Sequence, residues 1–290
     1  MKYLLLFIGL LYYHVNVLAQ ETINWYHPNF PPANFVEGLM EGLGHNDQAE
    51  KFIASHMPNY NHNYITASYQ RIIHNLKFNQ GCSVGISKNP EREKKLFFSI
   101  PYLLTFPNGV IIKEEQFKQF SRYLEKNGTI SVKRLLNDER LIAGIADGRK
   151  YQSFIDMELE RHRSKDNIMV RSSTDVFSGL LQMLDRERID YIFGFPEELA
   201  YHTSLGVLEN KMQFIPISEM PRFLTSYVVC SKTRSGQKAI DEINLVLTKY
   251  RTTPEFLRFY EFWLDFDSKK RHKRISLTEL SSSVKKAPLR

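Results

Sequence analysis

Two arginines of this 290-residue chain lie where a guanidinium could hold an anion, because a guanidinium can donate two parallel hydrogen bonds to a carboxylate. Arg149 ends the turn Asp147-Gly148-Arg149 ahead of a predicted helix, whose free N–H groups attract anions, although the turn can equally be a simple helix cap. Arg92 lies in a charged helix start between Glu91 and Glu93. The residues alone favour an ordinary surface ion pair for Arg92.

Other groupings that support chemistry are missing from the sequence. The glycines of segment 38–44 do not have the dinucleotide-binding spacing, and no strand leads directly into them. The four histidines between positions 45 and 74 do not have the spacing of zinc ligands. No nucleophile accompanies a base, and no paired carboxylates indicate acid–base catalysis. We therefore expect no enzyme activity, no metal and no cofactor.

The net charge of +7 is confined to the end of the chain. Eight basic residues and one glutamate lie in segment 269–290, so the preceding 268 residues carry no excess charge. A nucleic-acid-binding protein needs positive charge on its folded surface, and this distribution argues against nucleic acid as a partner. Since segment 269–290 is rich in serine and lysine, we predict a solvated, disordered tail.

The first 19 residues have the pattern of a signal peptide. Lys2 precedes a short apolar segment, and Val17-Leu18-Ala19 matches a signal-peptidase site, so we predict cleavage after Ala19 and a mature chain from Gln20. The apolar segment is shorter than the roughly 20 residues that span a membrane. We therefore expect an exported, periplasmic protein. In such an oxidising compartment its two cysteines can pair, although two free buried thiols are the alternative.

Strands and helices alternate along the chain in two units of similar size. The first unit has predicted elements at 23–26, 46–57, 63–65, 67–80 and 82–86. The second has predicted strands at 109–112, 141–145, 168–170 and 189–193, and predicted helices at 114–127, 131–137, 149–161 and 174–188. The last third adds a strand at 225–230 and helices at 235–250 and 254–264. This order predicts two α/β lobes, with a cleft between them as the preferred ligand site.

The order of several short motifs resembles that of the family 3 extracellular solute-binding proteins. These motifs are Trp25 to Pro32, Met57-Pro58, Arg71, Gln80-Gly81, Ser87 to Arg92, Phe98 to Tyr102, Gly144 to Tyr151, Met183 to Tyr191 and Tyr227 to Lys232. The Glu-Arg pair followed by Phe-Ser-x-Pro-Tyr is the most specific of them. The resemblance covers about residues 22–265.

The resemblance implies a two-lobed type II periplasmic binding protein fold, in which two crossing strands form a hinge and the lobes close on a solute. It divides the chain into a first lobe of residues 20–108 and 221–268 and a second lobe of residues 109–220. The basic tail of residues 269–290 follows them. It also implies a binding function without catalysis, and a transporter of the ABC type or a sensor as partner. We further expect a monomer.

The same resemblance assigns roles to individual residues. The arginine that matches Arg92 holds the carboxylate of the ligand in amino-acid-binding members, and Ser87 can add a hydroxyl from the same loop. Arg149 and Tyr151 match positions where the family places ligand contacts. The alternatives from the residues remain an ion pair for Arg92, and a helix cap and a core tyrosine for the other two.

Three aromatic residues, Trp25, Tyr26 and Tyr102, match the walls of the family's ligand site, while aromatics beside strands are equally often core residues. One position departs from the amino-acid-binding members, which carry there the aspartate that holds the ligand's ammonium group. This chain has Phe195, with two glutamates displaced by two and three residues. The resemblance therefore implies a small polar solute, and an ordinary α-amino acid is in doubt.

The returning strand of this fold runs beside the strand that begins at Cys82, so the resemblance implies that Cys82 and Cys230 are neighbours and form a disulfide. Two other functions remain open. A small periplasmic enzyme of the dehydratase type uses the same scaffold, and would turn over its ligand. An orphan module that binds a protein partner would have a cleft filled by side chains.

Overall fold

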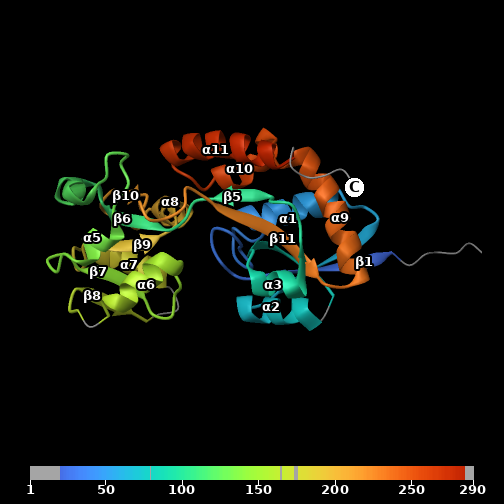
Figure 1. Ribbon diagram of the computed structural model, residues 1–290, viewed down its shortest axis with the longest axis horizontal. Coiled ribbons are helices and arrows are strands. Elements are labelled where there is room, and N and C mark those ends of the chain that lie inside the picture. The colour runs from blue at the N-terminus through green and yellow to red at the C-terminus, as the bar shows by residue number, and fades with distance from the viewer. Residues whose placement is uncertain (1–19, 79, 164, 173–175, 285–290) are drawn as a thin grey trace, which may run out of the picture.

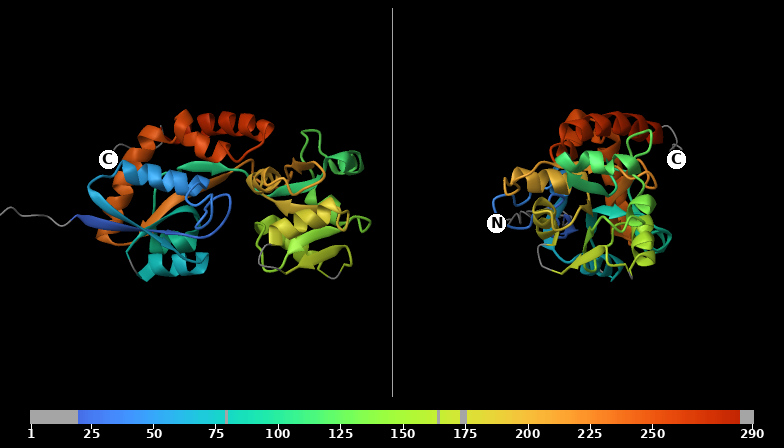
Figure 2. Two further views of the ribbon diagram at one scale, coloured as in Figure 1. Left: turned by 180° about the vertical axis from the view of Figure 1, so that it is seen from behind. Right: turned by 90° about the vertical axis from the view of Figure 1, so that its left-hand side faces the viewer.

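The computed structural model describes residues 20–284 except 79, 164 and 173–175, and these residues form two lobes that lie side by side (Figure 1). The predicted signal peptide of residues 1–19 lies outside the described residues. Within the described part of the chain, no helix combines the length and the apolar character needed to cross a membrane. Figure 2 shows the same two lobes from behind and along the long axis.

The sheet of lobe 1 combines parallel strands from the first part of the chain with a strand that returns from lobe 2. Its strands are β1 (Glu21–His27), β2 (Tyr60–Thr66), β3 (Cys82–Ser87), β4 (Leu96–Phe98), β5 (Leu103–Thr105) and β11 (Leu224–Ser231). The order is β2-β1-β3-β11-β4, and β5 also pairs with β11. β1 is parallel to β2 and β3, whereas β11 is antiparallel to β3, β4 and β5.

Helices cover both faces of this sheet. They are α1 (His45–Ser55), α2 (Tyr69–Phe78), α3 (Pro90–Lys95), α9 (Arg234–Tyr250), α10 (Pro254–Glu261) and α11 (Phe266–Val284). Successive strand residues point to opposite faces, so Trp25 packs with α1, α9 and α10, while Tyr26 packs with α2. Lobe 1 therefore has one hydrophobic core on each side of its sheet.

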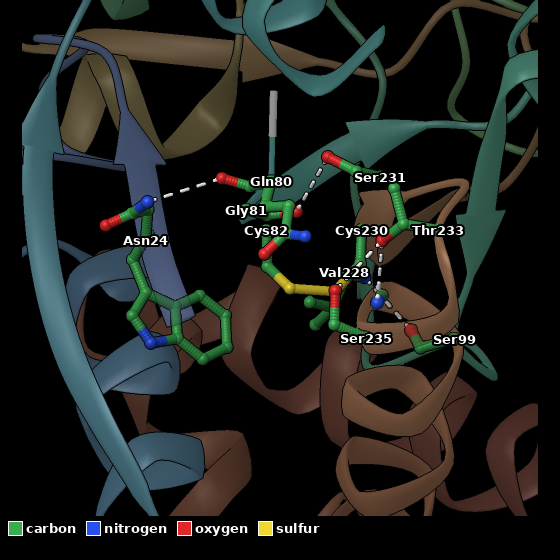
Figure 3. The surroundings of a disulfide bond; sticks show 12 residues. Asn24, Gln80, Gly81, Cys82, Ser99, Val228, Cys230, Ser231, Thr233 and Ser235 are labelled. Carbon is green, nitrogen blue, oxygen red and sulfur yellow. Dashed lines mark hydrogen bonds between the residues drawn. A yellow bond between two sulfur atoms is a disulfide. The ribbon is translucent and has the colours of Figure 1, made fainter. Parts of the chain in front are cut away.

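A disulfide joins the two parts of the chain that build lobe 1 (Figure 3). Cys82 begins β3, Cys230 lies directly opposite it on β11, and their sulfur atoms are 1.98 Å apart. Both cysteines are buried in the core that contains Trp25. On the other side of β11, the backbone N–H of Val228 donates to the hydroxyl of Ser99, which follows β4.

Lobe 2 has a smaller mixed sheet of five strands, in the order β10-β6-β9-β7-β8. The strands are β6 (Gly109–Lys113), β7 (Ala143–Ala146), β8 (Ile168–Arg171), β9 (Tyr191–Gly194) and β10 (Met212–Ile215). β7 is parallel to β8 and β9, and β6 is antiparallel to β9 and β10. Its helices are α4 (Phe117–Phe120), α5 (Val132–Leu136), α6 (Ser153–Arg161), α7 (Val176–Asp185) and α8 (Pro196–Ser204).

The helix predicted over 114–127 is interrupted. Two short 3₁₀ turns, Glu114–Gln116 and Ser121–Tyr123, flank the single turn of α4. The chain is extended at Leu124, which pairs with Ile130 across the turn that follows. The spacing of the apolar residues therefore predicted too long a helix, because Leu124 reaches the core of lobe 2 from an extended segment.

The chain crosses between the lobes twice. It passes from β5 to β6 through residues 106–108 and returns from β10 to β11 through residues 216–223. Asn108 is buried, and its side-chain amide donates to the carbonyl of Tyr151 in lobe 2. The two crossings lie at the junction of the sheets, where a hinge is expected.

The disordered tail predicted from residue 269 is wrong as far as residue 284, because α11 continues through these residues and packs on lobe 1. Ile275 and Leu280 lie in the lobe 1 core, and Ser276 and His272 are buried between them and β5. The His272 ring is 2.9 Å from the carbonyl oxygen of Leu104. Polar residues thus form much of the buried face of α11, which is why the apolar pattern of the sequence did not reveal a helix.

Candidate functional site

A cavity of about 530 Å³ lies between the lobes and is lined by residues of both. Lobe 2 contributes Gln152, Phe195 and Glu197. Lobe 1 and its crossing strands contribute Pro32, Ala33, His45, Asn46, Gly85, Ser87, Lys88, Thr105 and Leu224 to Tyr227. A space enclosed by both lobes changes shape when the lobes move, so this cavity has the geometry for capturing a small molecule by closure.

A second cavity of about 760 Å³ adjoins the first on lobe 1, and the two share Asn46 and Gly85. Its walls include residues 28–30 after β1 and residues 67–69 after β2, together with Arg71. These segments follow the carboxyl ends of parallel strands, which is the edge where open α/β sheets bind ligands. The two cavities therefore form one concave surface on lobe 1.

A buried hydrogen-bond network fixes Asn46 at the junction of the two cavities. The hydroxyl of Tyr102 donates to the side-chain oxygen of Asn46 at 2.6 Å, and the Asn46 amide donates to Asn34 at 3.1 Å. Asn34 in turn donates to Asp47 at 2.6 Å. Gly85 has a φ of 86°, and a Cβ at this position would overlap the Asn46 amide. Glycine is thus required where β3 passes Asn46.

The loop after β3 brings the predicted residues Arg92 and Ser87 together. Asn89 caps α3 by accepting the backbone N–H of Arg92 at 2.9 Å. The Arg92 Nη1 then donates to the Ser87 carbonyl at 2.7 Å and to its hydroxyl at 2.8 Å. Ser87 lines the interlobe cavity. Arg92 does not line the cavity, but it is hydrogen-bonded to Ser87. The alternative ion pair of Arg92 with Glu91 or Glu93 is not formed among the described residues, and Glu93 pairs with Lys88 at 2.7 Å.

The predicted anion site at Arg149 is filled by the chain's own carboxylate. Two guanidinium nitrogens of Arg149 donate to the two carboxylate oxygens of Glu198 at 2.9 and 2.6 Å. The rings of Tyr151, Phe177 and Phe195 lie 5.1 to 5.8 Å from the guanidinium carbon. Burial lowers the pKa of Arg149 and the Glu198 charge raises it, with a net rise, so the guanidinium stays charged. In this arrangement Arg149 is not available to a solute.

The four aromatic side chains predicted as ligand contacts are instead core residues, with exposed fractions of 0 to 6%: Trp25, Tyr26, Tyr102 and Tyr151. The indole N–H of Trp25 donates to His62 at 3.0 Å, inside lobe 1. The hydroxyl of Tyr151 accepts the backbone N–H of Ala146 at 2.7 Å, inside lobe 2. The polar ends of Trp25 and Tyr151 are thus bonded within their own lobes, and contact of the four aromatic side chains with a solute stays a prediction.

Several residues that line the interlobe cavity were not among the ligand contacts expected from the sequence. Lys88 follows Ser87 directly, and its ammonium lies 5.5 and 5.6 Å from the ring centres of Phe98 and Tyr227. Gln152 has a φ of 91°, and its side-chain oxygen accepts the backbone N–H of Asn108 in the hinge. The loop position of Lys88 next to Ser87 was the only signal for either residue.

Helix α8 connects lobe 2 to lobe 1 at the hinge side of the cavity. Glu197 is 7% exposed and accepts the hydroxyl of Tyr260, on α10, at 2.9 Å. The same hydroxyl accepts the backbone N–H of Phe106 in the first crossing. Burial raises the pKa of Glu197 to about 8, so its carboxyl is largely protonated at neutral pH. Tyr201 of α8 adds an aromatic contact to Trp263 of lobe 1, with ring centres 5.8 Å apart.

His45 lies beside this connection. Its ring is 5.1 Å from that of Tyr260, it is 5% exposed, and its Nδ1 has no hydrogen-bond partner. Burial lowers the pKa of His45 to about 3, so the ring is neutral. Among the described residues, no group of three or more histidine, cysteine or acidic side chains is arranged to hold a metal ion.

No protein-family model and no curated protein matches this chain. Its solved structural neighbours include a probable amino-acid ABC transporter extracellular-binding protein from Bacillus subtilis. That structure is 16% identical with a TM-score of 0.62, and the match covers 85% of this chain and 99% of that chain. An ancestral arginine-binding protein bound to arginine is 17% identical with a TM-score of 0.56, and the match covers 84% and 98% of the two chains.

A third similar structure is a histidine kinase sensor domain with similarity to periplasmic binding proteins, at 13% identity and a TM-score of 0.56, covering 84% of this chain and 96% of that chain. Identities this low establish the fold alone. The two mixed α/β sheets, joined by two crossings, form the two-lobed fold of periplasmic binding proteins, as the sequence resemblance implied.

Proposed function

We propose that this chain, which has the two-lobed fold of periplasmic binding proteins, is an exported protein that captures a small carboxylate-bearing solute between its lobes. The observation that carries the proposal is the cavity of about 530 Å³ lined by both lobes at the ends of parallel strands. Its volume suits a solute of amino-acid to short-peptide size. The captured solute would then pass to a transporter or a sensor, the two settings in which similar structures occur.

The charges around the cavity support a carboxylate. Lys88 lines it, and Ser87 holds Arg92 close behind. The Nε and Nη2 of Arg92 have no hydrogen-bond partner among the described residues, so they can turn to a carboxylate bound at Ser87. Arg92 is therefore the proposed clamp for the solute, whereas Lys88 is already paired with Glu93 at 2.7 Å.

The opposite wall supports a solute without a required ammonium group. Phe195 lines the cavity where amino-acid-binding members of the family carry an aspartate. Glu198 is neutralised by Arg149, and Glu197 is buried and bonded to Tyr260. Since none of the described residues of lobe 2 that line the cavity carries an ionised carboxylate, we propose an organic acid or an acyl or aromatic derivative of an amino acid rather than a free α-amino acid.

A thermal-shift screen tests the proposal with amino acids, small organic acids, polyamines and muropeptides. A solute at 100 times its dissociation constant stabilises the folded protein by about 2.7 kcal/mol. Arg92→Ala should abolish the shift, and Arg258→Ala is a matched control because Arg258 is an exposed arginine of α10 outside both cavities. A shift that survives in Arg92→Ala would reject the clamp. Finding no ligand with folded protein, or finding turnover of the ligand, would reject solute capture.

A further inference from the structure

A third cavity, of about 470 Å³, lies on the hinge between α11 and lobe 2. It shares no lining residue with the interlobe cavity. Phe106 of the first crossing and Arg222 of the second form part of its wall, and Arg271 and Arg274 reach it from α11. This hinge cavity is separate from the proposed solute site.

The lining of the hinge cavity is strongly positive. Arg222, Arg271 and Arg274 line it, and no lining residue is acidic. None of the three arginines forms an ion pair within 4 Å in the described part of the chain. Three guanidinium groups around one space repel each other, and this repulsion favours a bound counter-ion.

Arg271 is the most constrained of the three. Its guanidinium carbon lies 4.3 Å from the ring centre of Phe106, and its buried Nε has no hydrogen-bond partner among the residues that the structure describes. Burial lowers the pKa of Arg271, and the nearby Asp265 and Asp267 raise it by less. A buried guanidinium donor without an acceptor is costly, so an acceptor from outside the chain would stabilise it.

Glu219, which follows the cavity residue Ser218 in the chain, is already bound to other groups. Its two carboxylate oxygens accept the hydroxyls of Ser131 at 2.7 Å and of Ser218 at 2.8 Å. It also faces the backbone N–H of Val132. The Glu219 carboxylate therefore binds the start of α5 and is not paired with the arginines of the cavity.

The two walls of the hinge cavity belong to different lobes. Ile275 of α11 packs in the core of lobe 1, whereas Ile217 packs in the core of lobe 2. An anion bound to Arg271 and Arg274 would thus lie against residues of lobe 2, such as Asn127 and Thr129. Its affinity depends on how the lobes are arranged, as expected of a coupled site.

From this geometry we propose that the hinge cavity is a second binding site, which takes a small oxyanion of two or more charges, of the phosphate or pyrophosphate class. Fork-shaped guanidinium groups match the oxygens of such anions. The volume leaves room for a diphosphate but not for a large polyanion. The site does not depend on the identity of the solute in the interlobe cavity.

Isothermal titration of the purified protein with inorganic pyrophosphate, at low and at physiological salt, tests this site. We expect saturable 1:1 binding that Arg274→Gln and Arg222→Gln each weaken about tenfold, the loss of one charge-assisted contact. Both side chains are exposed, so these variants should fold, whereas Arg271→Gln also removes packing on Phe106. Arg258→Gln removes the same charge outside the cavity and should change the affinity less than about twofold.

Three results would overturn the proposal. The first is no binding of pyrophosphate to the folded protein, and the second is an equal loss of affinity in Arg258→Gln, which would mean binding by net charge alone. The third is sedimentation with phosphatidylglycerol vesicles without any pyrophosphate binding, because the arginines would then face lipid headgroups rather than a free oxyanion. A failed solute screen leaves each of these outcomes unaffected.

Discussion

Replacing the buried Glu197 with glutamine should remove a pH-dependent part of the protein's stability. Glu197 is buried against lobe 1 and accepts the hydroxyl of Tyr260, and burial raises its pKa to about 8. Glutamine has the same shape and keeps an oxygen for Tyr260, but it does not titrate. Comparing the two proteins therefore isolates the ionisation of this one carboxyl.

The size and sign follow from the difference in proton affinity. A folded-state pKa of about 8 against 4.5 for an exposed glutamate corresponds to about 5 kcal/mol. The folded state binds the proton more tightly, so this stabilisation is fully present below pH 4.5 and is lost as the pH rises through 8. Arg149 favours ionisation and Glu198 opposes it, and both are smaller effects than burial.

Urea unfolding between pH 5 and pH 9, followed by tryptophan fluorescence, measures this effect. The free energy of unfolding of Glu197→Gln minus that of the unmodified protein should rise by several kcal/mol, on the order of 3 to 5, between pH 5 and pH 8.5. Glu242→Gln, at an exposed position of α9, should show no such rise. A difference that stays constant across this pH range would refute the reasoning, because Glu197 would then be ionised or exposed.

Three further predictions concern stability. Replacing Cys82 and Cys230 with alanine opens a loop with a sequence separation of 148 residues, and should lower the free energy of unfolding by about 5 kcal/mol. Urea unfolding measures this loss, and the unmodified protein with its disulfide reduced is the control. Gly85→Ala should cost about 1 to 3 kcal/mol by the same assay, because φ is positive there and the added Cβ has no space. Arg149→Ala should cost about 3 to 5 kcal/mol by leaving Glu198 charged and unpaired, and the double variant with Glu198→Gln should recover most of this loss.

The division into two α/β lobes and most of the strands and helices along the chain were predictable, because apolar periodicity marks them. β11 is an example, since alternating residues of Thr225 to Cys230 face the two cores of lobe 1. The last helix was not predictable. Its buried face contains His272 and Ser276, which bond to each other and to β5, and polar residues of this kind count as exposed in any sequence pattern.

The site was less predictable than the fold, because contacts between residues far apart in the sequence determine which side chains a solute can reach. Arg149 stands at a helix start that suits an anion, yet Glu198, 49 positions later, occupies its guanidinium. Trp25 and Tyr102 lie near strand ends, but the side of the sheet that each faces depends on packing that only the structure gives. Arg92 and Ser87 were placed together correctly because they belong to one loop.

The disulfide has a consequence for the order in which the protein can form. Cys82 and Cys230 lie on either side of the whole of lobe 2, so lobe 2 is one uninterrupted stretch of chain and lobe 1 is not. If the chain leaves a membrane channel N-terminus first, lobe 2 can complete its sheet while β3 still lacks its neighbour β11. The covalent bond then closes lobe 1 last. It also means that a single proteolytic cut within lobe 2 would leave both fragments covalently joined.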